Sequence, residues 1–527
     1  MKKGFRQKAA LLLAACSIVS FAGCSANPSS GSSSTGPSAA GSAGYEDTVN
    51  IGIAGDPTTL DPNQTGIGPT ETTVMNEIYE GLVKPSADSK TIEPGLASSW
   101  KISSDGLTYT FQLKPDIKFS DGTPVKPEDW IWSLTRARDC ETSEYRFIAE
   151  AIKDVKADDK TVTITLTKKW APFLADLCTF NMVVGSKAYY DKVGGAAYAQ
   201  KPLGTGPYML KDWQKGSALS LVKNPYYYKS GYPKTANLKF SVVTDDNTRL
   251  MQLQSGQIDV MGDVPYSEID TIKKDQNLKI QTYESTQIRY LILNTTQKPL
   301  DNLKVRQAIL YATNKQEIAS LVAKSYGKPV ASVLSESQGK WFNSDLKVTS
   351  YDPDKAKQLL QEAGFPNGVT LTVSVSSGSQ VYQQIATLLK SEWAKAGINA
   401  NIELLEKAAL NNKFQSLKHQ VTILQWVDDI LDPSEISGWI TDYSQSHAWY
   451  TGLQDQSLQD LNTKASEEMD ETARLQMYKD IQQKISDNVN VVPLFRNDFV
   501  YAMSGKVQNL EVSPFSVMRL EDIQKTK

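Results

Sequence analysis

The sequence predicts an α/β protein made of more than one structural unit. Several short segments alternate apolar and polar residues, as half-buried strands do, and other segments place apolar residues at the spacing of an amphipathic helix. The chain has 527 residues, of which 40% are hydrophobic and 22% are charged. This length and composition suit about two to four units of ~100–200 residues, each with a sizeable core.

The composition argues against two functional classes. Lys and Arg total 56 and Asp and Glu total 59, so the net charge is -3 and the chain lacks the basic surface of a nucleic-acid-binding protein. The two histidines, His419 and His447, are too few for a His-rich metal centre. We therefore expect no nucleic-acid partner, no resident metal and no cofactor.

The first 23 residues have the features of an export signal. Four basic residues among the first eight precede a mostly apolar stretch at 9–23, which is too short for a stable transmembrane helix. The small residues before Cys24 resemble a bacterial lipoprotein signal, in which the protein is cut before a cysteine that carries lipid. Cys16 also fits, but the apolar core before it has only about seven residues, so we favour Cys24. An ordinary secreted protein with a buried cysteine is the alternative.

Residues 25–44 are small or polar and carry no charge. Such a segment cannot bury enough apolar surface to fold, and a flexible coil of this length spans roughly 25 Å. We expect residues 24–44 to be a flexible tether. Together with a lipid on Cys24, it would hold an extracytoplasmic protein at the cell membrane.

Strands and a helix are expected in the first part of the folded body. The segments 49–53, 107–113 and 162–166 alternate apolar and polar residues and are predicted to be strands. Pro127, which is followed by two acidic residues, is predicted to open a helix, because the first turn of a helix favours proline and negative charge.

The second half of the chain contains a clear strand–helix–strand–helix–strand pattern. A helix opens at Asp352 and Pro353 and stops at Gly364. The elements that follow are strands at 369–375, 398–404 and 421–426, with helices at 381–393 and 408–417 between them. Short links between them imply parallel strands joined by right-handed crossovers.

Four polar or aromatic residues stand at the end of the strand 421–426. They are Trp426, Asp428, Asp429 and Asp432. Ligands of open α/β sheets bind beyond the carboxyl ends of the strands, so this group is our first candidate for a binding site.

Six further motifs follow one another along the chain. They are EPGLASSW (93–100) with SDGLTYTF (104–111), KFSDGTPV (118–125), GTGPY (204–208) with KNPYY (223–227), LQSGQID (253–259), LNTT (293–296) with VRQA (305–308), and WVDDILDP (426–433). Together, behind a lipoprotein signal, they closely resemble the oligopeptide/dipeptide-binding proteins, which are the peptide- and nickel-binding extracytoplasmic receptors of ABC importers. The resemblance covers the chain from about residue 50 to its C-terminus.

The resemblance implies a two-lobed, periplasmic-binding-protein-like fold of type II. The first lobe would comprise residues 45–287 and 491–527 with an extra subdomain at about 85–203, and the second lobe residues 288–490. The chain would cross outward near 285–290 and return near 488–492. The lobes would close over the ligand like a clamp.

The function that the resemblance implies is reception rather than catalysis. The protein would be a monomer that captures oligopeptides at the cell surface and delivers them to the permease subunits of an ABC transporter. Peptide length and sequence preference stay open.

The resemblance also assigns a role to Asp429. Peptide-binding members carry W-x-x-D-x-x-[DE]-P here, and the central Asp pairs with the α-amino group of the ligand. An ammonium that enters a closed cleft loses water, so it needs a partner charge and hydrogen-bond acceptors. A solvated loop carboxylate is the alternative for Asp429. Trp426 fits ligand stacking and core packing equally, whereas Asp432, just before Pro433, is better explained as a helix cap.

One departure from the family's pattern argues against a strict specificity for dipeptides. Its dipeptide receptors hold the ligand carboxylate with an arginine before the helix that carries W-A-K-x-G. Residues 393–397 match that motif, but the loop at 376–380 contains no arginine. Longer peptides or another cationic ligand therefore stay open.

Four further residues are candidates to line the cleft. Tyr290 and Asn294 lie near the expected outward crossing, and Met261 and Gly262 follow the LQSGQID motif. Structural roles fit these four residues at least as well.

Two other functions fit the sequence less well than a peptide receptor does. An extracellular hydrolase is disfavoured, because no nucleophile-elbow, zinc-protease or phosphate-loop motif is present, and the adjacent Asp428 and Asp429 of an extended chain point to opposite faces. A receptor for nickel or a nickel chelate is the runner-up. A chelate needs few protein ligands, although two histidines argue against a direct nickel site.

Cys140 and Cys178 both fall in the expected extra subdomain. An exported protein can form a disulfide, but two buried free thiols fit equally, because the sequence does not give the Cα separation that a bridge requires.

Overall fold

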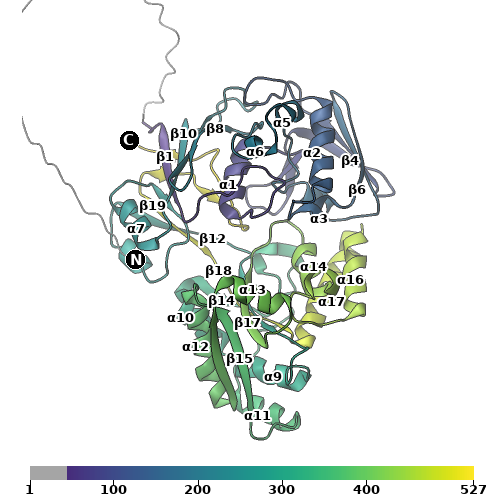
Figure 1. The fold of residues 1–527 in the computed structure, drawn as a ribbon, viewed down its shortest axis with the longest axis vertical. Helices are drawn as coiled ribbons and strands as arrows, with labels where there is room; N and C mark the ends of the chain where they lie inside the picture. The colour runs from purple at the N-terminus through teal and green to yellow at the C-terminus, as the bar shows by residue number, and fades with distance from the viewer. Residues whose placement is uncertain (1–43) are drawn as a thin grey trace, which may run out of the picture. The chain divides into compact units, whose positions relative to one another are not determined.

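A computed structural model describes residues 44–527 of the chain (Figure 1). The predicted signal at 1–23, the lipidation candidate Cys24 with its alternative Cys16, and the tether up to residue 43 lie outside the described residues. Within residues 44–527, no helix is both long and apolar enough to cross a membrane.

In the described part of the chain, the first large sheet has seven strands in the order β12-β19-β11-β1-β10-β9-β8. Their bounds are β1 Thr48–Ile53, β8 Tyr208–Gln214, β9 Ala218–Lys223, β10 Asn237–Val242, β11 Val260–Met261, β12 Leu278–Tyr283 and β19 Phe499–Ser504. β1 runs parallel to both β10 and β11. Its side chains Val49, Ile51 and Ile53 are buried in the core of this sheet, which confirms the strand predicted at 49–53.

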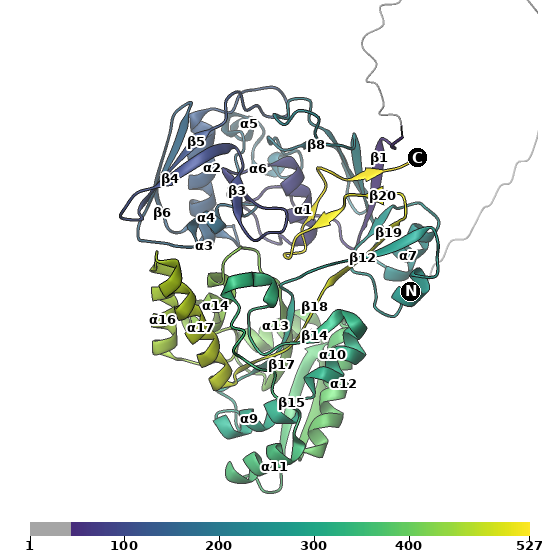
Figure 2. The ribbon, with the colours of Figure 1, turned by 180° about the vertical axis from the view of Figure 1, so that it is seen from behind.

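The C-terminal segment packs beside this first sheet. Its short strands are β20 Val507–Gln508, β21 Glu511–Val512, β22 Met518–Arg519 and β23 Gln524–Lys525. β20 pairs with β23, and β21 pairs with β22. A further bridge joins Tyr45 to Thr526, so the two ends of the described chain lie together (Figure 2).

An antiparallel sheet with the order β4-β5-β7-β6 lies within the limits expected for the extra subdomain. Its strands are β4 Ala97–Ile102, β5 Thr108–Leu113, β6 Ile152–Ala157 and β7 Thr161–Leu166, and the small pair β2 Val83–Pro85 and β3 Ile92–Pro94 precedes them. β5 and β7 confirm the strands predicted at 107–113 and 162–166.

Helices cover this antiparallel sheet and the first sheet. They are α1 Pro69–Ile78, α2 Pro127–Asp139, α3 Arg146–Ala149, α4 Phe173–Asp176, α5 Lys187–Val193, α6 Gly195–Tyr198, α7 Asp246–Gln254 and α8 Ile269–Ile272. α2 begins at Pro127 as predicted, and Asp129 in its first turn accepts a hydrogen bond from the backbone N–H of Lys126 at 2.9 Å.

The second large sheet contains six strands from residues 288–497, in the order β14-β18-β13-β17-β15-β16. Their bounds are β13 Ile288–Leu293, β14 Gly327–Pro329, β15 Val369–Ser376, β16 Ile398–Leu405, β17 Val421–Trp426 and β18 Val491–Asn497. β15 runs parallel to β16 and to β17, and α12 Gln380–Lys395 and α13 Lys407–Gln415 link the three strands. The parallel unit predicted from the hydrophobic pattern is therefore confirmed.

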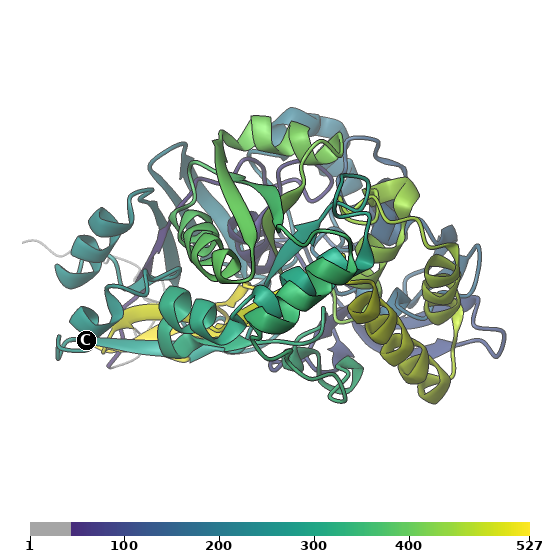
Figure 3. The same cartoon turned by 90° about the horizontal axis from the view of Figure 1, so that it is seen from below.

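The remaining helices belong to residues 303–488. They are α9 Leu303–Ala312, α10 Lys315–Ala323, α11 Pro353–Glu362, α14 Ser434–Thr441, α15 Tyr443–Ser446, α16 Gln456–Glu467 and α17 Glu471–Asn488, with the 3₁₀ helices η1 Lys324–Tyr326 and η2 Glu336–Trp341. α11 confirms the predicted start, because the carboxylate of Asp352 accepts from the backbone N–H of Lys355 at 2.8 Å. α16 and α17 pack side by side (Figure 3).

The two large sheets are joined by two connections. β12 belongs to the first sheet and β13 to the second, so the chain crosses at 284–287, whereas the family resemblance implies a crossing near 285–290. The chain returns to the first sheet later than the boundary expected at residue 490. Residues 491–497 are fully buried and form β18 of the second sheet, and only at Asp498 does the chain pass to β19. An apolar segment after a helix adds one more strand to the sheet before the chain leaves it.

Candidate functional site

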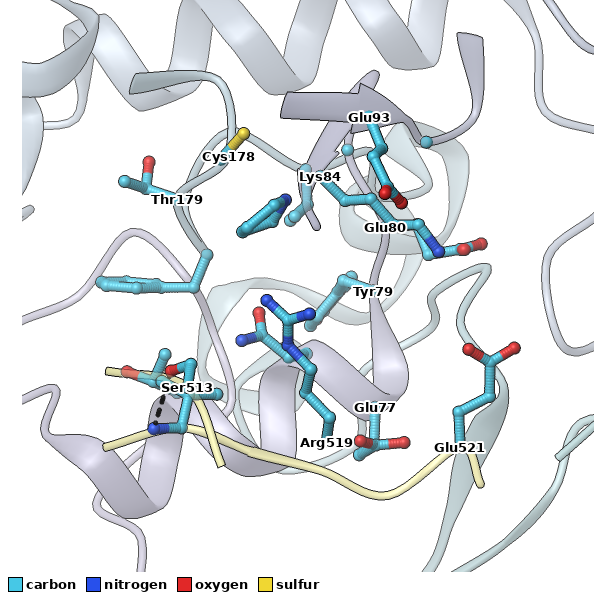
Figure 4. Close-up of a pocket in the computed structure, with 18 of the residues that line it drawn as sticks. Glu77, Tyr79, Glu80, Lys84, Glu93, Cys178, Thr179, Ser513, Arg519 and Glu521 are labelled. Atoms are coloured by element: carbon cyan, nitrogen blue, oxygen red, sulfur yellow. Dashed lines mark hydrogen bonds between the residues drawn. The ribbon is translucent and has the colours of Figure 1, made fainter. Parts of the chain in front are cut away.

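A cavity of about 310 Å³ lies beside the C-terminal end of α1. Glu77, Tyr79 and Glu80 line it from α1 and the residues that follow, and Arg519 and Glu521 line it from the C-terminal segment (Figure 4). Asp429 and Leu431, which follow β17 of the second sheet, also line it. Its volume is at the lower end of the ~300–1,000 Å³ that is usual for ligand sites. We call it the Asp429 cavity.

Asp429 is held by groups from two regions of the chain. Its Oδ2 accepts a hydrogen bond of 3.0 Å from the hydroxyl of Tyr145, which precedes α3. Its backbone N–H donates to Glu435 Oε2 at 2.8 Å, and that oxygen also accepts from the N–H of Ile430 at 3.4 Å. The loop after β17 is thus fixed by the first turn of α14, and the Asp429 carboxylate faces the extra subdomain.

Asp428 points to a different set of partners. Its Oδ2 accepts from Gln338 Nε2 at 2.8 Å, and its Oδ1 accepts from Trp426 Nε1 at 3.2 Å. Adjacent residues of an extended segment point to opposite sides, and the two carboxylates accordingly bind different elements. They do not flank one bond as glycosidase carboxylates do.

Asp428, Asp429 and Glu435 form an acidic cluster. Asp428 is 2% exposed and Glu435 is 5% exposed, whereas Asp429 is half-buried. Burial raises the pKa of all three carboxyl groups above their usual range, because a charged carboxylate loses water when it is buried, and the repulsion between neighbouring carboxylates raises the pKa of Asp428 and Glu435 further. Among the described residues, none of the three makes an ion pair within 4.0 Å.

Such a cluster favours the binding of a cation. A buried carboxylate without a positive partner is costly, and an ammonium group placed beside it supplies both the charge and the hydrogen-bond donors that water provided. Within residues 44–527, no three His, Cys, Asp or Glu side chains are arranged so that they could hold a metal ion.

Trp426 ends β17 in an aromatic cluster. Its ring lies 5.6 Å from Trp439 and 5.8 Å from Trp449, measured between ring centroids. Trp449 belongs to a run of four left-handed residues, at positions 447–450, with φ between 45° and 63°. Trp426 is half-buried and packs partly against the core of the second sheet, and it does not line the Asp429 cavity.

Tyr290 and Asn294 occupy packed positions outside the Asp429 cavity. Tyr290 is 1% exposed, and its hydroxyl donates to the carbonyl of Val333 at 2.9 Å. Asn294 is fully buried, and its amide donates to the carbonyls of Leu417 and His419 at 2.9 and 2.8 Å. These contacts tie the end of β13 to the neighbouring loop.

Met261 and Gly262 also lie apart from Asp429. Met261 is fully buried in the core formed by α7, α8 and β19. A side chain at Gly262 would meet the ring of Tyr501 at 3.0 Å. The structure therefore brings Asp429 alone among the predicted cleft residues to the cavity.

Asp432 does not cap α14 as predicted, because the capping position is Pro433 and the helix has no side-chain cap bond. Asp432 Oδ1 accepts from the N–H of Ser434 at 3.0 Å, and its two oxygens bind Arg474 at 2.7 Å. The side chains of Asp432 and Arg474 are 5% and 6% exposed. The spacing to Pro433 suggested the cap, whereas the partner on α17 is 42 residues away and left no local signal.

Within the described chain, Cys140 and Cys178 are free thiols, so the disulfide that the sequence allowed is absent there. The thiol of Cys140 donates to the carbonyl of Asn63, and that of Cys178 donates to the carbonyl of Leu174.

Several residues of the site gave no signal in the sequence. Tyr145 directly precedes α3, and Glu435 lies in the first turn of α14. Glu77 lies near the end of α1 and Glu80 just after it, and no recognisable motif marks any of the four. Acidic residues after Pro433 are common at helix starts, so only the fold shows that Glu435 holds the backbone of Asp429.

Comparisons with known proteins agree with this architecture. Residues 91–447 match the family described as "Bacterial extracellular solute-binding proteins, family 5 Middle". The chain is 28% identical over 499 residues to the dipeptide-binding protein of Escherichia coli (strain K12), an alignment that covers 89% of this chain and 93% of that protein.

Solved structures share the fold. The ABC transporter-associated periplasmic binding protein DppA from Helicobacter pylori, in complex with the peptide STSA, matches with a TM-score of 0.79 and 26% identity, covering 92% of this chain and 99% of that one. NikZ from Campylobacter jejuni, in complex with Ni(L-His), matches with a TM-score of 0.77 and 24% identity, covering 89% and 96%, and shows the fold alone. The predicted two-lobed type II fold is thereby confirmed.

Proposed function

Because the chain belongs to the bacterial extracellular solute-binding proteins of family 5, we propose that it captures peptides outside the cytoplasm and delivers them to the permease of an ABC importer. Its relatives include a dipeptide-binding protein, and a structural neighbour was solved with a bound peptide. Both support a peptide as the ligand.

The observation that carries this proposal is the acidic cluster of the half-buried Asp429 with the buried Asp428 and Glu435, which makes no ion pair within the described residues. In the proposal, the α-amino group of a peptide binds Asp429. The ammonium supplies the positive charge that the cluster lacks, and its three N–H groups supply donors. The Tyr145 hydroxyl holds one carboxylate oxygen in place while the ligand binds.

Capture by closure follows from where these groups lie. We assign residues 45–287 and the C-terminal segment to one lobe and the second sheet with its helices to the other. Asp429 then belongs to the second lobe and Tyr145 to the first. Closure removes water from the ammonium and strengthens its attraction to the carboxylate. Release returns the peptide intact, so the protein acts as a receptor and not as an enzyme.

The proposal includes attachment to the cell membrane. A lipid on Cys24 and the tether at 24–44 would hold the receptor at the surface as a monomer, within reach of its permease.

A nickel chelate is the second candidate ligand, because a structural neighbour was solved with Ni(L-His). Calorimetry with a mixture of tripeptides, with nickel alone and with nickel plus histidine separates the two. Binding of tripeptides, recovered uncut by mass spectrometry, is the expected result. Binding of nickel with histidine and of no peptide would favour the second candidate, and cleaved peptides would indicate a hydrolase.

A further inference from the structure

The Asp429 cavity contains a second acidic region, away from the cluster around Asp429. Seven carboxylates and three cations line the cavity. The carboxylates are Glu77, Glu80, Glu93, Asp429, Glu511, Glu521 and Asp522, and the cations are Lys84, Lys229 and Arg519. Among the described residues, Glu521 alone of the seven makes an ion pair, with Lys229 at 2.9 Å. The lining therefore has an excess of unpaired negative charge.

In two of these carboxylates, one oxygen is buried and has no hydrogen-bond partner among the described residues. Glu77 is 3% exposed; its Oε1 accepts from the N–H of Leu520 at 2.9 Å, and its Oε2 has no hydrogen-bond partner among the described residues. Glu80 Oε1 accepts from the hydroxyls of Tyr227 and Tyr228 at 3.4 and 3.3 Å, and its Oε2 likewise has no partner in residues 44–527.

The cations of the lining do not neutralise these two groups. Arg519 extends from the C-terminal segment into the cavity (Figure 4), and it donates to Ser86 O at 2.6 Å and to Ser89 Oγ at 3.1 Å. Lys229 is occupied by Glu521. Arg519 lowers the pKa of Glu77, and Lys84 and the nearby Lys114 lower that of Glu80, but burial raises both pKa values by more.

The pKa values of Glu77 and Glu80 are raised, because no bonded cation offsets their burial. Burial raises the pKa of Glu77 to about 8 and that of Glu80 to about 7. Near neutral pH both carboxyls are therefore partly protonated, and a cation brought beside them would drive the proton off.

The rest of the lining suits an aliphatic chain. Leu177, Phe180, Val183, Val517 and Met518 contribute apolar surface to the same cavity. A lysine or arginine side chain has a long apolar stem and a charged end, so apolar walls beside unpaired carboxylates are its chemical complement.

We infer that the cavity binds a second cationic group of the ligand, the charged end of a lysine or arginine side chain, beside Glu77 and Glu80. This inference rests on the proposed function, since it assumes that a peptide binds with its amino terminus at Asp429. The inference adds to the proposed function a preference for peptides that contain lysine or arginine. If Glu77 serves only to hold the C-terminal segment through Leu520, its replacement changes stability but not this preference.

The test compares lysine with acetyl-lysine at each position of a tripeptide of otherwise alanine residues. The acetyl group keeps the stem and removes the charge. By calorimetry, the lysine peptide should bind about tenfold tighter or more at one position. In Glu77→Gln and Glu80→Gln the ratio should fall towards one, whereas the exposed control Glu150→Gln should keep it. Glutamine can still accept from Leu520, and thermal unfolding shows that each variant is folded.

A second measurement determines how many protons are released when the peptide binds. Calorimetry at pH 7 in buffers of different ionisation enthalpy should show that the lysine peptide releases more protons than its acetylated partner, by up to about one. Equal affinities and equal proton release for the two peptides would overturn this inference while leaving peptide binding intact. If no tripeptide binds, the proposed function fails, and the inference fails with it.

Discussion

Tyr145 and Asp429 are 284 residues apart in the chain, and the Tyr145 hydroxyl donates a 3.0 Å hydrogen bond to Asp429 Oδ2. Tyr145 directly precedes α3, within the limits expected for the extra subdomain, whereas Asp429 follows the end of β17 in the second sheet. The bond joins the two halves of the protein at the group that we propose to bind the ligand.

Tyr145→Phe should therefore weaken peptide binding. Hydrogen bonds to charged groups contribute about 1.5–3 kcal/mol, so the loss should be roughly tenfold or more in affinity. Tyr189→Phe is the matched control, because its hydroxyl donates to the carbonyl of Lys201 in the same subdomain. Tighter binding by Tyr145→Phe, measured by calorimetry, would mean that the hydroxyl competes with the ligand for Asp429.

Asp432→Asn should unfold more readily than the wild type. It leaves Arg474 buried without its charge partner, which typically costs about 3–5 kcal/mol. The exposed Asp354, which pairs with Lys357 on the surface, gives the control variant Asp354→Asn, whose denaturation midpoint should hardly change. Similar midpoints for the two variants in urea would show that the buried pair contributes little.

Local patterns predicted the elements of the second half well, because each depends on residues close in sequence. The alternation in β15, β16 and β17 and the capped start of α11 are of this kind. The parallel order followed from short links and the handedness of crossovers. The same pattern placed Asp429 at a strand end, where it lines a cavity.

Partners distant in sequence could not be predicted. Nothing near Tyr145 indicates that its hydroxyl reaches Asp429, and nothing near Asp432 indicates Arg474. Tyr290 and Asn294 are candidates for the cleft because they are close in sequence to the expected crossing. In the structure, however, Tyr290 donates to the carbonyl of Val333, and Asn294 donates to the carbonyls of Leu417 and His419. Which face a strand residue presents depends on the sheet order, which single segments do not fix.

Glu77→Gln should change the pH dependence of stability. Burial raises the pKa of Glu77 to about 8, with Glu80 and Glu521 raising it and Arg519 lowering it. The folded state therefore holds a proton that the unfolded state loses near pH 4.5, so the wild type loses stability as pH rises from about 4.5 to 8. Glu77→Gln has no carboxyl group at this position, so it should not lose this stability as the pH rises.

Relative to Glu77→Gln, the wild type should lose roughly 3–5 kcal/mol of unfolding free energy between pH 5 and pH 8.5. Urea denaturation of the ligand-free wild type and of ligand-free Glu77→Gln at the two pH values measures this loss of unfolding free energy. Parallel pH profiles would mean that Glu77 titrates normally in the folded protein.

Cys24→Ala should abolish lipid attachment. Lipoprotein processing needs the thiol as the site of the lipid, so the variant should keep its signal and incorporate no labelled fatty acid. Cys16→Ala is the matched control and should be processed normally. Continued labelling of the Cys24 variant would move the lipid to Cys16.

Asp429→Asn tests the central assignment. If Asp429 binds the ligand's ammonium, the variant keeps the shape of the side chain but loses its charge. Loss of one member of a buried charge pair costs about 2–5 kcal/mol, and the isosteric amide should fall near the lower end, roughly thirtyfold in affinity. Its ligand-free stability should change little in comparison with Asp432→Asn.

The most direct measurement is a double cycle that combines Asp429→Asn with N-acetylation of the same peptide, read by calorimetry. Acetylation should weaken binding to the wild type strongly and to Asp429→Asn much less, because the charge partner is already gone in the variant. Equal losses in the two proteins would show that Asp429 does not bind the amino terminus and would contradict the account.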